Sequence, residues 1–126
     1  MQPLWMRHWS RGYPRIACGA PCGVFVEHVR RPGTIWNLGV AGLYVVMPEP
    51  LPALETRVVL TFSLPGERTS IACLGRIRWL NAPSIFKGCG STKPSLPPGC
   101  GVEFVELAAL DRERIAARVR ACAPPH

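Results

Sequence analysis

The sequence predicts a mainly β protein, a small six-stranded antiparallel barrel or rolled sheet with one α-helix at its C-terminus. The first observation is a series of six short extended runs separated by turns, the pattern of small barrels. The second is a single helical run after the last of them. The third is size, because 126 residues, 48% of them hydrophobic, suffice for one domain with a core.

The extended runs define the predicted strands. From Cys22 onward hydrophobic and polar residues alternate, and Pro32-Gly33 is expected to turn the chain into a second strand, which makes a hairpin. The later strands are expected at residues 42–46, 57–64, 71–80 and 100–105. In the run 71–80, the predicted core residues are Ala72, Leu74 and Ile77.

The remaining segments divide the chain. Residues 1–21, rich in Trp, Arg, Gly and Pro, are expected to form a flexible arm, 22–121 the barrel with its helix, and 122–126 a tail. Residues 81–98 form an 18-residue loop of mainly Pro, Gly, Ser and Lys. A loop of that length either covers a ligand or is a disordered hairpin tip.

The C-terminal helix is expected to begin at Asp111 and to be amphipathic. Ile115, Val119 and Cys122 share one stripe, which predicts that they pack against the sheet. The arginines of this helix lie mostly off the stripe, so they are expected to form a solvated face rather than a second binding site.

The charge balance indicates an anionic partner. The formal net charge is +7, from 15 basic and 8 acidic residues, and among the basic residues only Lys87 and Lys93 are lysines. Arginine grips phosphate, carboxylate or a guanine edge with a planar fork, whereas lysine is a point charge. A nucleotide or nucleic acid is therefore one candidate partner; a GC-rich genome is the other explanation of the arginine excess.

The cysteines and histidines do not predict a metal site. The six cysteines include no CxxC pair, and the three histidines fall at no ligand-like spacing. We expect no signal peptide, because Arg7 and Arg11 interrupt the N-terminal apolar residues, and no run approaches the ~20 apolar residues of a membrane span. The expectation is a cytoplasmic protein with reduced thiols, no metal and no cofactor.

Two stretches carry a candidate binding site. In the first, RGYPR at 11–15, Arg11 and Arg15 are four residues apart without an acidic neighbour. This spacing puts both guanidinium groups on one side of a strand or a helix, and Pro14 favours extended geometry. The pair could hold a phosphate and a guanine, yet an arginine-rich chain also produces this pattern by chance, as RHWSR at 7–11 illustrates.

The second stretch, NLGVAG at 37–42, lies where two predicted strands join. Asn37 can accept and donate hydrogen bonds, and Gly39 and Gly42 permit positive φ and close approach to the backbone. Turns of this type also present amide donors to anions. Taken alone, the stretch is equally well a turn that connects two strands.

Together these stretches resemble the PilZ domain. The order is RxxxR on an N-terminal arm, then a turn similar to [D/N]xSxxG, then GRIRWLN and GCGVEFVEL before a short helix. The resemblance covers roughly residues 11–120. It implies a six-stranded barrel with a C-terminal helix that acts as a bacterial receptor for the second messenger cyclic di-GMP.

The resemblance also implies roles for individual residues. Arg11 and Arg15 match the arginines that hold guanine and phosphate in the family. Asn37 matches the position that bonds a guanine edge, and Gly42 matches the closing glycine. Trp79 corresponds to a tryptophan that packs against a guanine in some members, although packing within the barrel is an equally good interpretation.

Gly39 departs from the family pattern, which has serine at this position. Loss of the hydroxyl removes a hydrogen bond worth about 1–3 kcal/mol, roughly a five- to 150-fold loss of affinity. Two interpretations follow: a receptor with weakened binding, or a PilZ-like protein-interaction module with weak or no nucleotide binding. For the receptor, we expect the ligand to draw Arg11 and Arg15 onto the barrel beside Asn37, which alters a surface seen by a downstream protein partner.

Two other function classes fit less well. The scattered histidines and the absence of a Ser-His-Asp order provide no pair for acid–base chemistry, so we expect no catalytic residue and no enzyme. A general nucleic-acid-binding barrel would use Trp5, Trp9 and Tyr13, which are interleaved with arginines. It would bind unrelated oligonucleotides with steep salt dependence, whereas a receptor would prefer the cyclic dinucleotide.

Overall fold

The structure is a computed structural model that describes residues 15–82 and 96–122. In this part of the chain seven strands precede one helix. The elements are β1 Arg15–Ala17, β2 Pro21–Val26, β3 Val29–Gly39, β4 Gly42–Val46, β5 Arg57–Ser63, β6 Ser70–Asn81, β7 Gly99–Glu106 and α2 Ala109–Cys122.

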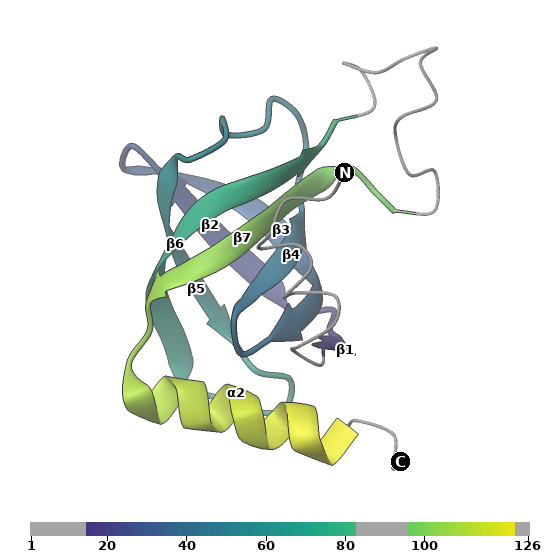
Figure 1. Cartoon of the computed structure of the whole chain (residues 1–126), viewed down its shortest axis with the longest axis vertical. Helices are drawn as coiled ribbons and strands as arrows, with labels where there is room; N and C mark the ends of the chain where they lie inside the picture. Colours follow the sequence, from purple (N-terminus) through teal and green to yellow (C-terminus); the bar gives the residue numbers. More distant parts are fainter. Residues whose placement is uncertain (1–14, 83–95, 123–126) are drawn as a thin grey trace.

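Six of the strands close into an antiparallel barrel (Figure 1). Neighbouring strands follow the order β3, β2, β5, β6, β7 and β4, and β4 pairs with β3 to complete the ring. The short β1 is an extra strand that pairs with β3, and α2 lies across one end of the barrel. The predicted fold class is therefore confirmed.

Alternate residues of each strand fill the barrel interior. The side chains with less than 2% of their surface exposed include Val24, Ile35, Leu38, Leu43, Val45, Val58, Leu60, Ile71 and Ile77. Because strand side chains alternate between the two faces, the residues between these point outward. The outer face of the barrel is therefore where polar and aromatic side chains can meet a ligand.

The predicted core of the run 71–80 is wrong at two of its three positions. Ile77 is fully buried, but Ala72 is exposed and Leu74 is half-buried on the outer side. The inward residues there are Ile71 and Cys73. Both alternating sets of residues in this segment include hydrophobic side chains. The alternation alone therefore could not predict which set faces the core.

The first hairpin turns at Glu27-His28, and the predicted turn at Pro32-Gly33 is wrong. Glu27 and His28 have φ of 49° and 69°, the conformation of a two-residue hairpin turn that matches strand twist. Pro32 and Gly33 instead lie inside β3 and pair with β2. Proline is tolerated because β4 joins β3 only from Thr34 onward, so at Pro32 one edge of β3 has no strand to bond.

Part of the predicted N-terminal arm is a strand. Residues 1–14, Arg11 among them, lie outside the described residues, but Arg15–Ala17 forms β1 instead of an irregular segment. The reason is that β3 is longer than β2. Without another strand, the last residues of β3 would have unpaired backbone groups on the edge that β2 does not reach. The strand β1 pairs with these residues, from Asn37 to Gly39.

Helix α2 is held on the barrel by an apolar stripe. Ile115 and Val119 are buried as predicted, whereas Cys122 is exposed because the buried part of the helix ends a turn earlier. The predicted helix start at Asp111 is wrong by two residues, because the helix begins at Ala109 and Asp111 lies in its first turn. No helix in residues 15–82 and 96–122 is long and apolar enough to cross a membrane.

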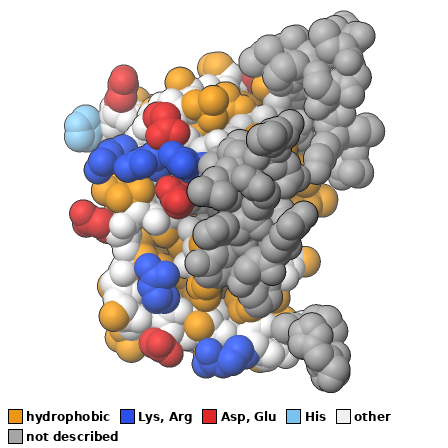
Figure 2. Space-filling view, in the orientation of Figure 1, with side chains coloured by type: hydrophobic (Ala, Val, Ile, Leu, Met, Phe, Trp, Pro, Cys, Tyr) orange, Lys and Arg blue, Asp and Glu red, His pale blue; other side chains and the backbone are white. Residues whose placement is uncertain are grey.

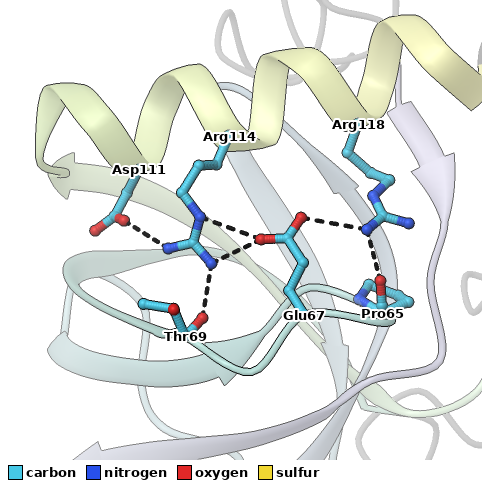
Figure 3. A network of polar contacts seen from close by, with 6 residues as sticks. All are labelled: Pro65, Glu67, Thr69, Asp111, Arg114 and Arg118. Atoms are coloured by element: carbon cyan, nitrogen blue, oxygen red, sulfur yellow. Dashed lines mark hydrogen bonds and ion pairs between the residues drawn. The ribbon is translucent and has the colours of Figure 1, made fainter.

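Two arginines of α2 are not the solvated side chains that the sequence predicted. Glu67, in the turn between β5 and β6, accepts hydrogen bonds from Arg114 at 2.8 Å and from Arg118 at 3.2 Å (Figure 3). Arg114 also pairs with Asp111 at 3.0 Å. The hydrogen bonds from both arginines lower the pKa of Glu67, so this ion-pair network ties α2 to the β5–β6 turn.

Candidate functional site

The candidate site lies on the outer face of the barrel, where β1, β3, β4, β7 and β6 are successive neighbours. Ile16 of β1 and Leu38 of β3 are cross-strand partners, and both are buried in the core. The residues beside them therefore point outward. This alternation places Arg15 and Asn37 on one outer face.

One row of cross-strand partners runs across the neighbouring strands of this face. Trp79 pairs with Gly101, Gly101 with Tyr44, Tyr44 with Asn37, and Asn37 with Ala17. Two of the predicted site residues, Trp79 and Asn37, therefore lie in one line across the sheet although they are far apart in sequence. Three strand spacings of about 4.8 Å separate them.

A second row of cross-strand partners runs parallel to the first. The two rows are separated by one row of residues that point into the core. Arg76 pairs with Glu103 and Glu103 with Gly42, and beyond the β3–β4 turn Gly39 pairs with Arg15. The centre of this row carries glycines and no side chain. Arg15 lies at one end of this row, and the cross-strand pair of Arg76 and Glu103 lies at the other.

Trp79 packs against Tyr44 across the intervening strand. Their ring centroids are 5.4 Å apart with an interplanar angle of 42°, a favourable tilted arrangement. Gly101 lies between them in the row, and its lack of a side chain lets the two rings meet. Tyr44 is buried and Trp79 is half-buried, so Trp79 combines barrel packing with a partly exposed ring.

Asn37 stands at a β-bulge. Between two buried pairs, β3 has two residues, Trp36 and Asn37, where β4 has only Tyr44. Such bulges redirect side chains and are frequent beside functional sites. The Asn37 Oδ1 atom is buried and accepts no hydrogen bond from the described residues. Because an unpaired buried acceptor costs about 1–3 kcal/mol, this oxygen is suited to a donor that a ligand brings.

Arg15 is the cation next to this acceptor. It lies directly opposite Gly39, and a diagonal neighbour such as Asn37 is about 7–8 Å away between Cα atoms. Desolvation lowers the pKa of the Arg15 guanidinium, although the group stays charged at neutral pH. The surrounding protein therefore partly shields the guanidinium from water.

The turn between β3 and β4 does not need the left-handed glycines suggested by the sequence. Among the described glycines Gly66 has positive φ, so Gly39 and Gly42 have backbone angles that other residues can adopt. Hydrogen bonds from neighbouring elements hold the turn in place. The Ala41 carbonyl accepts one from the Phe104 amide at 2.9 Å, and Arg112 of α2 donates one to the Val40 carbonyl at 3.2 Å.

A buried polar contact lies beside Trp79 and was not foreseen from the sequence. The Tyr44 hydroxyl donates to the Pro97 carbonyl at 2.5 Å and accepts from Asn81 Nδ2 at 3.3 Å. Asn81 also donates to the Leu96 carbonyl at 3.0 Å. Burial raises the pKa of Tyr44 to about 12. These bonds join the residues just before and just after segment 83–95, next to the aromatic pair.

Ion pairs cover the face next to Trp79. Arg78 donates to both carboxylate oxygens of Glu55, at 3.0 and 3.1 Å, and its Nε lies 3.7 Å from Glu103. Arg76 lies 3.9 Å from Glu55. Figure 2 shows basic side chains in a row on this side of the barrel with acidic side chains on both sides. Arg76 and Arg78 therefore lie beside acidic partners on this part of the outer face.

The cysteines do not form a metal centre in the described part of the chain, where no three His, Cys, Asp or Glu side chains gather as ligands. Cys22, Cys73 and Cys100 are buried in the barrel. Burial raises the pKa of each thiol to about 12. These thiols are therefore neutral near pH 7, whereas metal binding and nucleophilic attack need the thiolate.

The structure thus brings together most of the residues that the sequence singled out. Arg15, Asn37 and Gly39 lie side by side on β1 and β3, Gly42 is at the far end of the turn, and Trp79 lies in the row of Asn37. Arg11 falls outside the described residues.

The fold and the face define a small β-barrel module whose outer face carries an arginine, a buried amide oxygen with no donor among the described residues, and an aromatic pair. A family model of the PilZ domain matches residues 10–121, and the chain belongs to the PilZ domain family. A comparison with curated protein sequences gives no significant match.

Two solved structures share the fold. The inhibitor of motility MotI (DgrA) of Bacillus subtilis has a TM-score of 0.67 and 19% identity, over 88% of this chain and 50% of the MotI chain. This protein thus spans half the length of MotI. The PilZ domain of YcgR from Escherichia coli, solved with c-di-GMP, has a TM-score of 0.65 and 12% identity, over 88% of this chain and 89% of that domain.

Proposed function

We propose that this PilZ domain is a bacterial cytoplasmic receptor for cyclic di-GMP and acts as a signalling module without catalysis. The ligand binds between the RxxxR segment and the turn from Asn37 to Gly42. The observation that carries the proposal is the buried Asn37 Oδ1, which has no donor among the described residues and shares an outer face with Arg15. The YcgR PilZ domain, which has the same fold, was solved with this ligand.

The chemistry of guanine fits these residues. Its amino group is a donor for the Asn37 oxygen, while O6 and N7 are acceptors for an arginine fork. A charge-assisted bond from Arg15 or Arg11 can hold a phosphate. Trp79 offers a partly exposed ring for a base, and such stacking is worth about 1–3 kcal/mol. One ligand with two guanines and two phosphates uses all of these groups.

The signalling step concerns the residues before β1. Because Arg15 is paired in β1 opposite Gly39, the rearrangement we propose is limited to Arg11 and its neighbours, which the ligand draws toward the turn. The moved segment alters the surface offered to a downstream protein partner. The contact of Arg112 with the Val40 carbonyl links the same turn to α2, which gives the signal a second route.

An alternative function is a protein-interaction module with weak or no nucleotide binding. The observation that favours it is Gly39, which lies opposite Arg15 and lacks the serine hydroxyl of the family motif. The missing bond reduces affinity roughly five- to 150-fold. In this case the same outer face contacts a protein directly.

A calorimetric titration of the full chain with cyclic di-GMP tests the proposal. We expect saturable binding at micromolar to millimolar ligand that unrelated oligonucleotides do not displace. No heat of binding in this range would leave the protein-interaction module as the function. Equal competition by any oligonucleotide, with a steep loss at higher salt, would identify a general nucleic-acid binder instead.

A further inference from the structure

An exposed tryptophan stands beside the acceptor at the centre of the site. Trp36 has 46% of its surface exposed, and it directly precedes Asn37 in β3. Large aromatic side chains are usually buried more fully than this. None of the family motifs includes this position, and the proposed contacts of Arg15, Asn37 and Trp79 leave its ring without a role.

The bulge fixes the direction in which Trp36 points. The residue pairs on both sides of the bulge face the core and are fully buried, so the two residues between them lie outside the barrel. Trp36 is therefore on the outer side together with Asn37, opposite Tyr44. Its carbonyl accepts a hydrogen bond from the Cys18 amide at 3.1 Å, which holds the backbone of the bulge in place.

Trp36 and Arg15 lie on opposite sides of Asn37 along the strand. Trp36 precedes Asn37 by one residue, and the partner of Arg15, Gly39, follows it by two. At about 3.3 Å per residue, the run from Trp36 to Gly39 spans roughly 10 Å. A base between two flat groups needs about 7 Å, since stacked planes are about 3.4 Å apart. One base therefore fits between the indole and the guanidinium.

The geometry points to Trp36 as a second stacking residue, which covers one face of the guanine whose edge bonds Asn37, while Arg15 covers the other. This inference rests on the proposed cyclic di-GMP function. A base bonded in its own plane to Asn37 keeps both faces free for such contacts. The bulge presents the ring already in position, so little ordering is required on binding.

The test is a calorimetric titration of cyclic di-GMP with the full chain and three variants. Trp36→Thr removes the ring and keeps a residue suited to a strand, and Trp36→Phe keeps a ring. Val59→Thr is the matched control, because Val59 is also exposed, at 43%, on β5 away from the site. We expect Trp36→Thr to weaken binding roughly five- to 150-fold, Trp36→Phe to retain most of the affinity, and Val59→Thr to bind like the parent.

The outcomes separate this inference from the receptor function. If the parent chain binds and Trp36→Thr binds equally well, Trp36 does not stack on the base, while the receptor function stands. If the parent chain does not bind, the receptor function is wrong and this role of Trp36 is lost with it. If Trp36→Phe is as weak as Trp36→Thr, or both lower the melting temperature in step with affinity, the residue acts on the fold and the stacking role is refuted.

Discussion

Arg15 lies directly opposite Gly39 where β1 pairs with β3. The second arginine of RxxxR and the position at which the family motif has serine are therefore cross-strand neighbours, with Cβ positions about 4.5–5.5 Å apart. A side chain at residue 39 would lie beside the Arg15 guanidinium. The last residue of one sequence motif therefore lies in the same strand pair as residues of the other motif.

Removing the Arg15 fork should weaken cyclic di-GMP binding. We expect Arg15→Ala to reduce affinity roughly 10- to 150-fold, the range for hydrogen bonds to charged groups. Arg15→Lys should restore only part of it, because an ammonium group cannot bond two atoms of the base or phosphate in one plane. Calorimetry checks both. Arg120→Ala, which removes one exposed charge at the end of α2, should bind like the parent; an equal loss there would indicate a general charge effect.

Restoring the motif serine should strengthen binding. Gly39 is outside the positive-φ region, so serine can adopt its backbone, and the new hydroxyl would stand opposite Arg15. We expect Gly39→Ser to raise the affinity roughly five- to 150-fold in the same titration. Gly19→Ser is the control, because Gly19 has open space around it. Unchanged affinity in a folded Gly39→Ser protein would mean that the turn does not contact the ligand.

Tyr44 should make stability depend on alkaline pH. Its pKa is raised to about 12 from 10, so the unfolded chain releases the phenol proton at lower pH than the folded chain. The contribution is complete below pH 10 and is lost as pH rises from about 10 to about 12. In urea denaturation, Tyr44→Phe should cost about 0.5–1.5 kcal/mol at pH 7. Above pH 10, the free energy of unfolding of Tyr44→Phe should fall less than that of the parent. Parallel plots of this free energy against pH would contradict the raised pKa of Tyr44.

The ion-pair network of Glu67 should stabilise the attachment of α2 in a pH-dependent way. Hydrogen bonds from Arg114 and Arg118 lower the pKa of Glu67 below 4.5, so its contribution is present above pH 4.5 and is lost as pH falls through the lowered pKa. We expect Glu67→Gln to lower the melting temperature by a few degrees at pH 7 and to match the parent in acid. Glu113→Gln, an exposed position on α2, should have no such effect at either pH.

The sequence predicted the barrel well because the strands carry strong local signals, but it misplaced the first turn. Pro32-Gly33 is the strongest turn signal in that region, and yet it lies within β3. The actual turn at Glu27-His28 has positive φ at two residues that are not glycine, which is uncommon. The position of the turn depends on the pairing of β3 with three other strands, and a local sequence pattern cannot predict this pairing.

For the site, the sequence identified residues but not their neighbours. Arg15, Asn37 and Trp79 are predicted site residues because the sequence resembles the PilZ family at these positions. The contact of Trp79 with Tyr44 was not predicted, because it depends on the register of β6, β7 and β4 and on Gly101 between the rings. Trp36 was missed because the β-bulge, which turns it outward beside Asn37, leaves no mark in the alternation of the sequence.

The most direct test of the central claim, that cyclic di-GMP binds the face shared by Arg15 and Asn37, is a two-dimensional amide NMR titration of the full chain. We predict that signals of β1, of residues 37–42 and of the Trp79 indole shift with ligand, while those of β5 on the other side of the barrel stay in place. Shifts confined to β5 and its neighbours, or no shift at saturating ligand, would contradict the account.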